Sequence, residues 1–476
     1  MTRFTTSQIS FADLEFLNQG IRLEPMLQAI SDFIDHHGHL VDKVRRDLNR
    51  GLKNPKAGRD GLTAQQVLRS FVLQRVKNWK YRELRERISD GLTLRKFTRF
   101  YSEPVPKHDA FNRSFNRLTP ATIEVINDMV VNYAVELGLE NGKKLRADTT
   151  VVETDIHHPT DSTLMWDTVR VVTRLIGHLD DLLPQGVQGF TNRTRSARRR
   201  MQEIQRMTSK ERPNQLVPKY RELIHTTEQV VGNAREALKK TERVSSVDLM
   251  TEIAIKAVRK EIDHYCGLGD RVIDQARRRV LNKEQVPNEE KIFSIFETHT
   301  DLIKRGKILK PVEFGHKVYI AESARGLITQ YRVLKGNPTD DIHVEYSVAR
   351  HQETFGQVPK LYSADRGFFS QKNIDYCKDA GVELVCIPQR GGRKSEAQAS
   401  YEKSPAFKDG QRFRAGIEGR ISVLFRGRGM KRCLAEGRVR FELLVGAAVL
   451  ANNLMVIARL LLEKQNRQKR RYRAAA

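Results

Sequence analysis

Apolar residues recur at helical spacing through the first part of the chain. The pattern predicts a helix over 62–76, and its apolar face consists of Leu62, Val67, Leu68, Phe71, Val72 and Val76. Similar runs, separated by glycine and proline, predict further helices over 81–88, 92–100, 110–118 and 120–137. Thr119 precedes Pro120, the order of an N-cap residue followed by proline in the first turn. We therefore expect residues 1–140 to form a compact all-α domain.

The pattern changes at residue 145, where β-branched residues predict a strand over 145–153 with Asp148 in its middle. The sequence Asp161-Ser162-Thr163 is typical of a helix cap, and helical periodicity continues from there to about residue 283. A long helical segment therefore interrupts the sheet that the first strand joins. We interpret it as an all-α insertion.

Strand patterns resume near residue 310. Residues 311–321 and 327–334 flank a short turn and predict a hairpin. A helix over 341–356, a strand over 360–364 that ends at Asp365, a helix over 371–380 and a strand over 382–388 follow. This alternation indicates an α/β layer, and the polar segment 391–408 is expected to be a loop. We expect domain divisions at 1–140, 141–170, 171–290, 291–435 and 436–476, the last being a C-terminal helix and basic tail.

The longest apolar stretch, residues 443–462, is interrupted by Asn452, Asn453 and Arg459. Such side chains are costly near the centre of a bilayer, so we predict a packed core helix and no membrane partner. The N-terminus has no basic start followed by an apolar run, and we expect no secretory signal. Four cysteines without C-x-x-C spacing predict neither a disulfide framework nor a zinc finger. A cytoplasmic protein associated with the nucleoid is the expectation.

The net charge of the chain indicates which class of molecule it binds. Lys and Arg number 84 against 58 Asp and Glu, for a formal net charge of +26 and a pI near 10.0. Such a surface attracts a polyanion, and nucleic acid is the expected one. Two basic segments, 42–59 and 191–213, are either DNA contacts or solvated faces. The candidate DNA-binding residues in them are Arg45, Arg46, Arg198, Arg199 and Arg200. Phosphate loops of the Walker kind are absent, so ATP use is not expected.

Asp148, Asp365 and Glu418 are acidic residues far apart in sequence, and each lies in an informative context. The first two accompany predicted strands, whereas Glu418 lies on a helical pattern that is rich in arginine. Carboxylates from separate elements can share divalent cations, and Mg²⁺ suits oxygen ligands. The alternative is an ordinary amphipathic helix in which Arg414 and Glu418 form an ion pair one turn apart. His157 and His158, together with Asp155 and Asp161, also suggest a zinc site, but neighbouring histidines in a strand-to-helix loop rarely share a metal without a further, distant ligand.

Four segments occur in a specific order: ADTTVVETDIHHPTDSTLMWDTVR, FGHKVYIA, YSADRGFF and RAGIEGRISVLFRGRGMKRC. In these segments, and in NWKYRELRERISDGLTLRKFTRF near the N-terminus, the chain resembles bacterial insertion-sequence transposases of the DDE class, in the insertion sequence 5-like, 1182-like and ISNCY branches. Some relatives carry a Tyr and a Lys where this chain has Gln411 and Phe425. A hairpin-forming route that uses those two side chains is therefore in doubt.

The resemblance implies an α/β ribonuclease H-like catalytic core, a mixed five-stranded sheet flanked by helices, in which the first and fourth strands are neighbours. The N-terminal helices would bind DNA or mediate dimerisation. Asp148, Asp365 and Glu418 would be catalytic and hold two Mg²⁺ ions, with Mn²⁺ as a substitute. The partners would be double-stranded DNA, as terminal inverted repeats and as target, and further copies of the chain in a homodimer or larger assembly. The residues expected to contact phosphates are Arg414, Arg420, Arg426 and Arg428.

The implied activity is cleavage at the element ends followed by strand transfer of the 3′-hydroxyl into target DNA. Two alternatives stay open from the sequence. One is a metal-dependent nuclease that cuts without joining. The other is a non-catalytic DNA-binding protein derived from a transposase.

Overall fold

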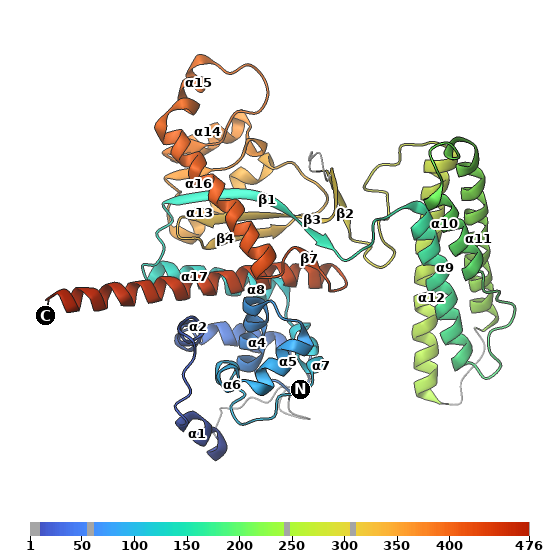
Figure 1. Cartoon of the computed structure of the whole chain (residues 1–476), viewed down its shortest axis with the longest axis horizontal. Helices are drawn as coiled ribbons and strands as arrows, with labels where there is room; N and C mark the ends of the chain where they lie inside the picture. The colour runs from blue at the N-terminus through green and yellow to red at the C-terminus, as the bar shows by residue number, and fades with distance from the viewer. Residues whose placement is uncertain (1–9, 55–60, 242–247, 305–310, 476) are drawn as a thin grey trace. The chain divides into compact units, whose positions relative to one another are not determined.

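The computed structural model describes residues 10–54, 61–241, 248–304 and 311–475 (Figure 1). Lys56, Arg59 and the first nine residues, on which sequence expectations also rest, lie outside these ranges. The chain divides into two compact units. One comprises Met1–Glu153 and His316–Ala476, and the other comprises Thr154–Gly315.

The N-terminal part of the first unit is all α-helical, as its periodicity predicts. Thr63 forms a capping box with Gln66 at the start of α4, and the Thr119 side chain accepts a hydrogen bond from the Thr122 N–H, which confirms it as the N-cap of α8. The helices are α1 (Phe11–Asn18), α2 (Pro25–His36), α3 (His39–Asn49), α4 (Ala64–Lys77), α5 (Tyr81–Asp90), α6 (Leu92–Thr98), α7 (His108–Phe115) and α8 (Pro120–Glu136).

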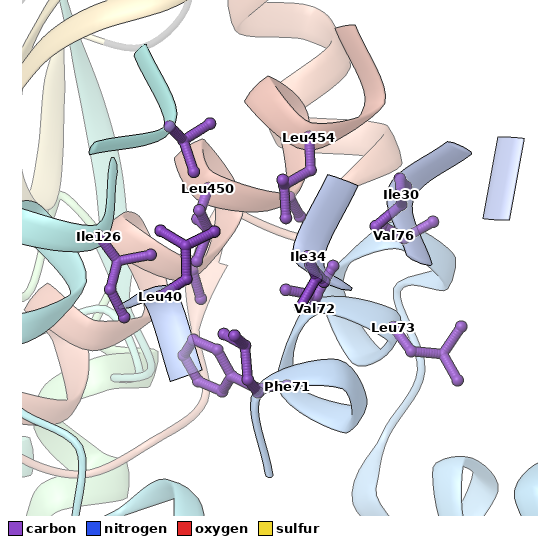
Figure 2. Close-up of a cluster of buried hydrophobic side chains, with 14 of the residues drawn as sticks. Ile30, Ile34, Leu40, Phe71, Val72, Leu73, Val76, Ile126, Leu450 and Leu454 are labelled. Atoms are coloured by element: carbon purple, nitrogen blue, oxygen red, sulfur yellow. The ribbon is translucent and has the colours of Figure 1, made fainter. Parts of the chain in front are cut away.

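The long C-terminal helix α17 (Arg438–Ala475) completes the core of this helical part. Figure 2 shows Leu450 and Leu454 of α17 among apolar side chains of α2, α3, α4 and α8, all of which belong to one core cluster. The segment Arg438–Arg471 is long and apolar enough to cross a membrane, but 83% of its most apolar window is buried inside the protein. The predicted core helix is therefore confirmed.

The sheet of the α/β layer has seven strands in mixed orientation, in the order β2-β3-β1-β5-β6, with β4 also pairing with β3 and β7 with β1. The expected count of five was wrong, because the short strands β2 and β7 carry no strand pattern of their own. β3 and β4 form the predicted antiparallel hairpin, and β1 pairs in parallel with β5. The strands are β1 (Lys144–Thr154), β2 (Asp301–Lys304), β3 (Val312–Ser323), β4 (Ile328–Val333), β5 (Leu361–Ser363), β6 (Leu384–Cys386) and β7 (Arg432–Cys433).

Alternation along the strands separates the two faces of the sheet. Leu145 and Ala147 of β1 lie in a core cluster with α13 (Val344–Phe355) and α14 (Gln371–Asp379). Val152 of the same strand belongs to a different cluster, which includes side chains of α17. Asp148 shares the parity of Val152 and therefore lies on the second face.

The helix that carries Glu418, α16 (Pro405–Ser422), packs against β5 and β6 and continues into a π-helical turn, Val423–Gly427. It is preceded by α15 (Glu396–Lys403). The expectation of a loop over 391–408 was therefore wrong for most of that segment. Ser395 and Ser404 are the N-caps of these two helices. The two serines could have predicted the helix starts, but the polar composition of the segment favoured a loop.

The described residues of the second unit form four helices that pack on one another, and Figure 1 shows them side by side, which confirms the helical periodicity predicted there. The N-cap of the first is Thr160, one residue before the predicted cap sequence, and it forms a capping box with Thr163. The four helices surround a common apolar core. They are α9 (Asp161–Leu182), α10 (Thr194–Arg206), α11 (Arg212–Lys240) and α12 (Leu249–Ala276).

Candidate functional site

The parallel pairing of β1 with β5 places Asp148 and Asp365 at equivalent points. Arg146 is in register with Ser363, and the two acidic residues follow two positions later on their respective chains. Asp148 lies in the middle of β1, and its side chain is 13% exposed. Asp365 comes directly after β5, where its Oδ1 accepts a hydrogen bond of 2.7 Å from the Gly367 N–H. The strand pairing therefore brings together two carboxylates that are remote in sequence.

Arg414 on α16 contacts all three predicted acidic residues. Its Nη2 lies 3.1 Å from Asp148 Oδ2 and 4.0 Å from Asp365 Oδ2. Its Nη1 lies 3.1 Å from Glu418 Oε1, one helical turn later. The ion pair of Arg414 with Glu418 thus exists, as the simpler interpretation of the helix predicted, but the same guanidinium also bridges the two strand carboxylates.

Close packing against β5 and β6 holds α16 in position. A Cβ atom at Gly410 would stand 2.2 Å from Cys386 Sγ, so glycine is needed for this approach. The Ser363 hydroxyl donates to the Gly410 carbonyl at 2.9 Å. The Gln411 amide donates to the Cys386 carbonyl at 2.6 Å. Gln411 therefore anchors the helix beside the end of β5, directly before Asp365.

A buried ionic network fastens the same helix to β1 and β3. Glu322 is fully buried and accepts hydrogen bonds from Arg146 Nε and Arg420 Nε, each at 2.8 Å. Arg146 also donates to the Phe413 carbonyl and stacks on the Phe413 ring, with its guanidinium carbon 4.7 Å from the ring centroid. Because Arg146 is two residues before Asp148, this network fixes the strand carboxylate relative to α16.

A fourth carboxylate, Asp340, lies beside the site. Its Oδ1 accepts a hydrogen bond of 2.9 Å from the Thr149 hydroxyl and forms an ion pair of 2.7 Å with Lys317. A Cβ at Gly367 would stand 2.9 Å from both an Asp340 and an Asp365 oxygen, which places these carboxylates on either side of that glycine. Sequence reasoning missed Asp340, since nothing separates it from the many other acidic residues in turns.

Burial dominates the electrostatics of Asp148. The pKa of its carboxyl is raised to about 6, chiefly because burial removes solvent and also because of the negative charges of Asp365 and Asp340. Arg414 and the Thr149 N–H lower it. The site is thus a place where negative charge is concentrated and incompletely neutralised, so a further cation would be stabilised there.

The donor set fits a hard divalent cation, because carboxylate oxygens are the ligands that Mg²⁺ prefers. Within the described parts of the chain, no three acidic, histidine or cysteine side chains already stand in a metal-holding arrangement. The Arg414 guanidinium lies between the carboxylates instead. Glu418 is 67% exposed and at the helix surface, so its side chain has room to change rotamer.

The structure gives the predicted DNA-binding arginines of the first unit different surroundings. Arg420 donates hydrogen bonds to Glu322 and Asn452, and Arg428 donates one to the Val76 carbonyl at the end of α4. Arg45 pairs with Asp42. Arg426 and Arg46 are exposed, and neither has a hydrogen-bond or ion-pair partner in the described ranges. These two are therefore available to a phosphate, whereas Arg420 and Arg428 hold α16 in place.

The arginines of α10 in the second unit also differ from one another. Arg200 pairs with Glu203 and Glu222, and Arg199 lies 3.8 Å from Glu203. Arg198 is exposed and has no such partner among the residues described. The same unit places His157 against Asp167, at 2.7 Å from its carboxylate. This hydrogen bond raises the pKa of His157, and its effect is larger than that of burial, which lowers the pKa.

Comparison with known proteins adds a family assignment for the N-terminal helices. Residues 16–117 match the family model described as Transposase domain (DUF772). This match runs from within α1 through α7, so the N-terminal helices are similar to a transposase domain. No curated protein and no solved structure matches the chain.

Proposed function

We propose that this protein is a DNA transposase of an insertion sequence of the DDE class, with a ribonuclease H-like core. The observation that carries the proposal is the convergence of Asp148, Asp365 and Glu418 around one guanidinium. These residues come from a strand, a strand end and a helix, as a metal-dependent phosphodiester site requires. The transposase-domain match of the N-terminal helices supports the same conclusion from an independent part of the chain.

Asp148, Asp365 and Glu418 would hold two Mg²⁺ ions, for which Mn²⁺ could substitute. When bound, such ions activate a nucleophile and stabilise the oxygen that leaves phosphorus. The chain's own groups supply position. Asp148 and Asp365 are fixed by neighbouring strands, and the network of Glu322, Arg146 and Arg420 fixes the helix that carries Glu418. Exposed cations such as Arg426 would contact phosphates of the strand being cut.

Both proposed reactions are displacements at phosphorus. In the first, a water oxygen bonds to phosphorus at the element end and the bond to the 3′ oxygen breaks, which releases a 3′-hydroxyl. In the second, that hydroxyl attacks a phosphorus of target DNA and displaces its 3′ oxygen. The proton of the attacking group passes to solvent, and no covalent protein intermediate is formed. Since two ends must be joined to one target, the active form is proposed to be a homodimer or larger on DNA, in the bacterial cytoplasm at the nucleoid.

The test is an assay with DNA that carries the element's own ends. Wild-type protein with Mg²⁺ is expected to release a 3′-hydroxyl end and to join it to a target plasmid. Asp148→Asn, Asp365→Asn and Glu418→Gln are each expected to lower cleavage at least roughly 10²-fold while retaining DNA binding. Asp375→Asn, which removes an exposed acid on α14, is the matched control and should cleave like wild type.

Three outcomes decide between the alternatives. Normal cleavage by Asp148→Asn overturns the assignment of the site. Cleavage without joining of a supplied 3′-hydroxyl end identifies a nuclease. Specific binding to the ends with no cleavage by folded wild-type protein, in Mg²⁺ or in Mn²⁺, identifies a non-catalytic DNA-binding protein.

A further inference from the structure

A pocket of the first unit that none of the candidate acidic residues lines has the features of a ligand site. It has a volume of about 790 Å³, within the range of small-molecule pockets. The end of α4, the start of α5, α7 and the start of α17 line it, together with the segment that contains β7. Most of this lining belongs to the part of the chain that matches the transposase domain.

One wall of the pocket is aromatic. Phe115 packs against Phe71 with ring centroids 5.2 Å apart, and against Tyr81 with centroids 5.7 Å apart. Trp79 lines the same pocket and is half-buried. Flat rings in this number offer stacking surfaces that a planar ligand can use.

A buried polar group in the pocket lacks its partner. Gln74 is 2% exposed, and its Nε2 has no hydrogen-bond partner within the described part of the chain. Its Oε1 accepts a hydrogen bond of 3.1 Å from Arg75. A buried amide that donates no hydrogen bond costs free energy, so a ligand with an acceptor at this point would be stabilised.

A cation beside Gln74 also lacks a counter-charge. The only hydrogen bond that the Arg75 guanidinium donates to a described residue is the one to Gln74. Burial lowers the pKa of Arg75. Arg75, Tyr81 and Arg440 all line the pocket. Burial raises the pKa of Tyr81, whereas the charges of the two arginines lower it. Neither arginine forms an ion pair with a described carboxylate, including that of Glu436 in the same lining.

We propose that this pocket binds a nucleotide, with its phosphate at Arg75 and Arg440 and its base against Trp79 and the neighbouring aromatic rings. An incompletely solvated, unpaired guanidinium favours an anion, and phosphate matches its donor geometry. Sequence-tolerant stacking of bases on aromatic side chains is the common way in which proteins hold unpaired nucleotides. Gln74 Nε2 would donate to an acceptor on the base edge. The same chemistry is offered by a free nucleotide and by an unpaired nucleotide in a DNA strand.

The chain provides its own reporter for this site. It contains two tryptophans, Trp79 in the pocket and Trp166 in the second unit. In a Trp166→Phe background, a base that stacks on Trp79 is expected to quench the remaining tryptophan fluorescence. The full-length protein is titrated with a deoxynucleoside monophosphate, a short single-stranded oligonucleotide, a duplex with unpaired ends and a fully paired, closed-end duplex of the same length.

Quenching by the oligonucleotide and the frayed duplex assigns the site to unpaired DNA, and quenching by the monophosphate alone assigns it to a free nucleotide. In either case Arg75→Gln and Gln74→Leu should each weaken binding roughly tenfold. This is the loss of affinity expected when one charge-assisted hydrogen bond, or one contact of similar energy to base stacking, is removed. Arg85→Gln is the control, because it removes an exposed charge of α5 outside the pocket. Thermal unfolding establishes that each variant is folded.

The proposal is overturned if none of the four probes quenches Trp79. It is also overturned if the closed duplex quenches as strongly as the unpaired DNA, or if Arg85→Gln weakens binding as much as Arg75→Gln. The result is separable from the proposed transposase activity. An Asp148→Asn protein keeps the pocket intact and should still show the quenching, so either conclusion can fail alone.

Discussion

Arg414 Nη2 donates a hydrogen bond of 3.1 Å to Asp148 Oδ2, from a helix that lies 266 positions later in the chain. This contact spans the point at which β1, the end of β5 and α16 meet. It gives the acidic residues a positively charged partner, and it links the packing of α16 directly to the geometry of the site.

Replacing Arg414 by glutamine should therefore destabilise the metal-free protein. Asp148 is only 13% exposed, so above neutral pH its charge would lose its nearest positive partner, at a cost of about 1–3 kcal/mol. Excess MgCl₂ should restore more stability to this variant than it adds to wild type. Glu418→Gln is the comparison, since Glu418 is 67% exposed and its ion pair contributes less than about 1 kcal/mol. Denaturant unfolding in EDTA and in MgCl₂ measures both; equal stability of Arg414→Gln and wild type would contradict the assignment.

Glu322→Gln should be among the most destabilising single changes in the first unit. It leaves the guanidinium groups of Arg146 and Arg420 without their shared, fully buried carboxylate. Breaking a buried pair on one side costs about 3–5 kcal/mol. Glu383→Gln removes one partner of an exposed pair with Lys360 and should change stability by less than about 1 kcal/mol. Urea midpoints of the two variants test this contrast, which fails if the two shifts are similar.

Two glycines of α16 should respond oppositely to alanine. A Cβ at Gly410 would overlap Cys386 Sγ, whereas nothing lies within 4 Å of a Cβ at Gly419. Gly410→Ala should lower stability by about 1–3 kcal/mol through overpacking. Gly419→Ala should raise it by about 0.5–1 kcal/mol, because glycine is a poor helix former. Thermal unfolding distinguishes them, and a stabilised Gly410→Ala protein would show that α16 does not approach β6 this closely.

We expect His351 to make the stability of the fold depend on pH, independently of the acidic site. Its Nε2 lies 2.7 Å from the Gly142 carbonyl just before β1, where Gly142 has a φ of +66° and a Cβ would clash with the Phe355 ring. Burial lowers the pKa of His351 from 6.5 to about 4. At pH values between these two pKa values, the unfolded chain binds more protons at His351 than the folded protein does. The contribution of neutral His351 to the free energy of unfolding is therefore complete above pH 6.5 and is lost as the pH falls towards 4.

His351→Gln removes that titration. The stability difference between wild type and His351→Gln should therefore shrink by about 3 kcal/mol as the pH is lowered through this window. Chemical unfolding of both proteins over the same pH series measures the difference. A difference that stays constant with pH would mean that the folded protein protonates His351 as readily as the unfolded chain does.

The elements that follow strong periodic patterns were predictable. The strand around Asp148, the hairpin of β3 and β4 and the helices α4, α5 and α8 lie where the spacing of apolar residues placed them. The short strands β2 and β7 were missed because two to four residues carry no alternation, and pairing with β3 and β1 alone makes them strands. The polar composition near residue 396 likewise hid α15, whose signal was its serine cap.

The amino-acid sequence by itself determined which residues have one apolar face, which acids end strands, and that the chain carries a large positive charge. Those properties depend on local spacing and composition. Only the tertiary structure decided that Arg414 lies among three acids, that Glu322 joins two arginines and that Asp340 stands beside Asp148. Apart from the Arg414–Glu418 pair, which lies within one helical turn, these contacts join segments that are remote in sequence, so they form only when the strands and α16 pack together. The identity of a single charged residue does not determine which residue it will contact in the folded protein.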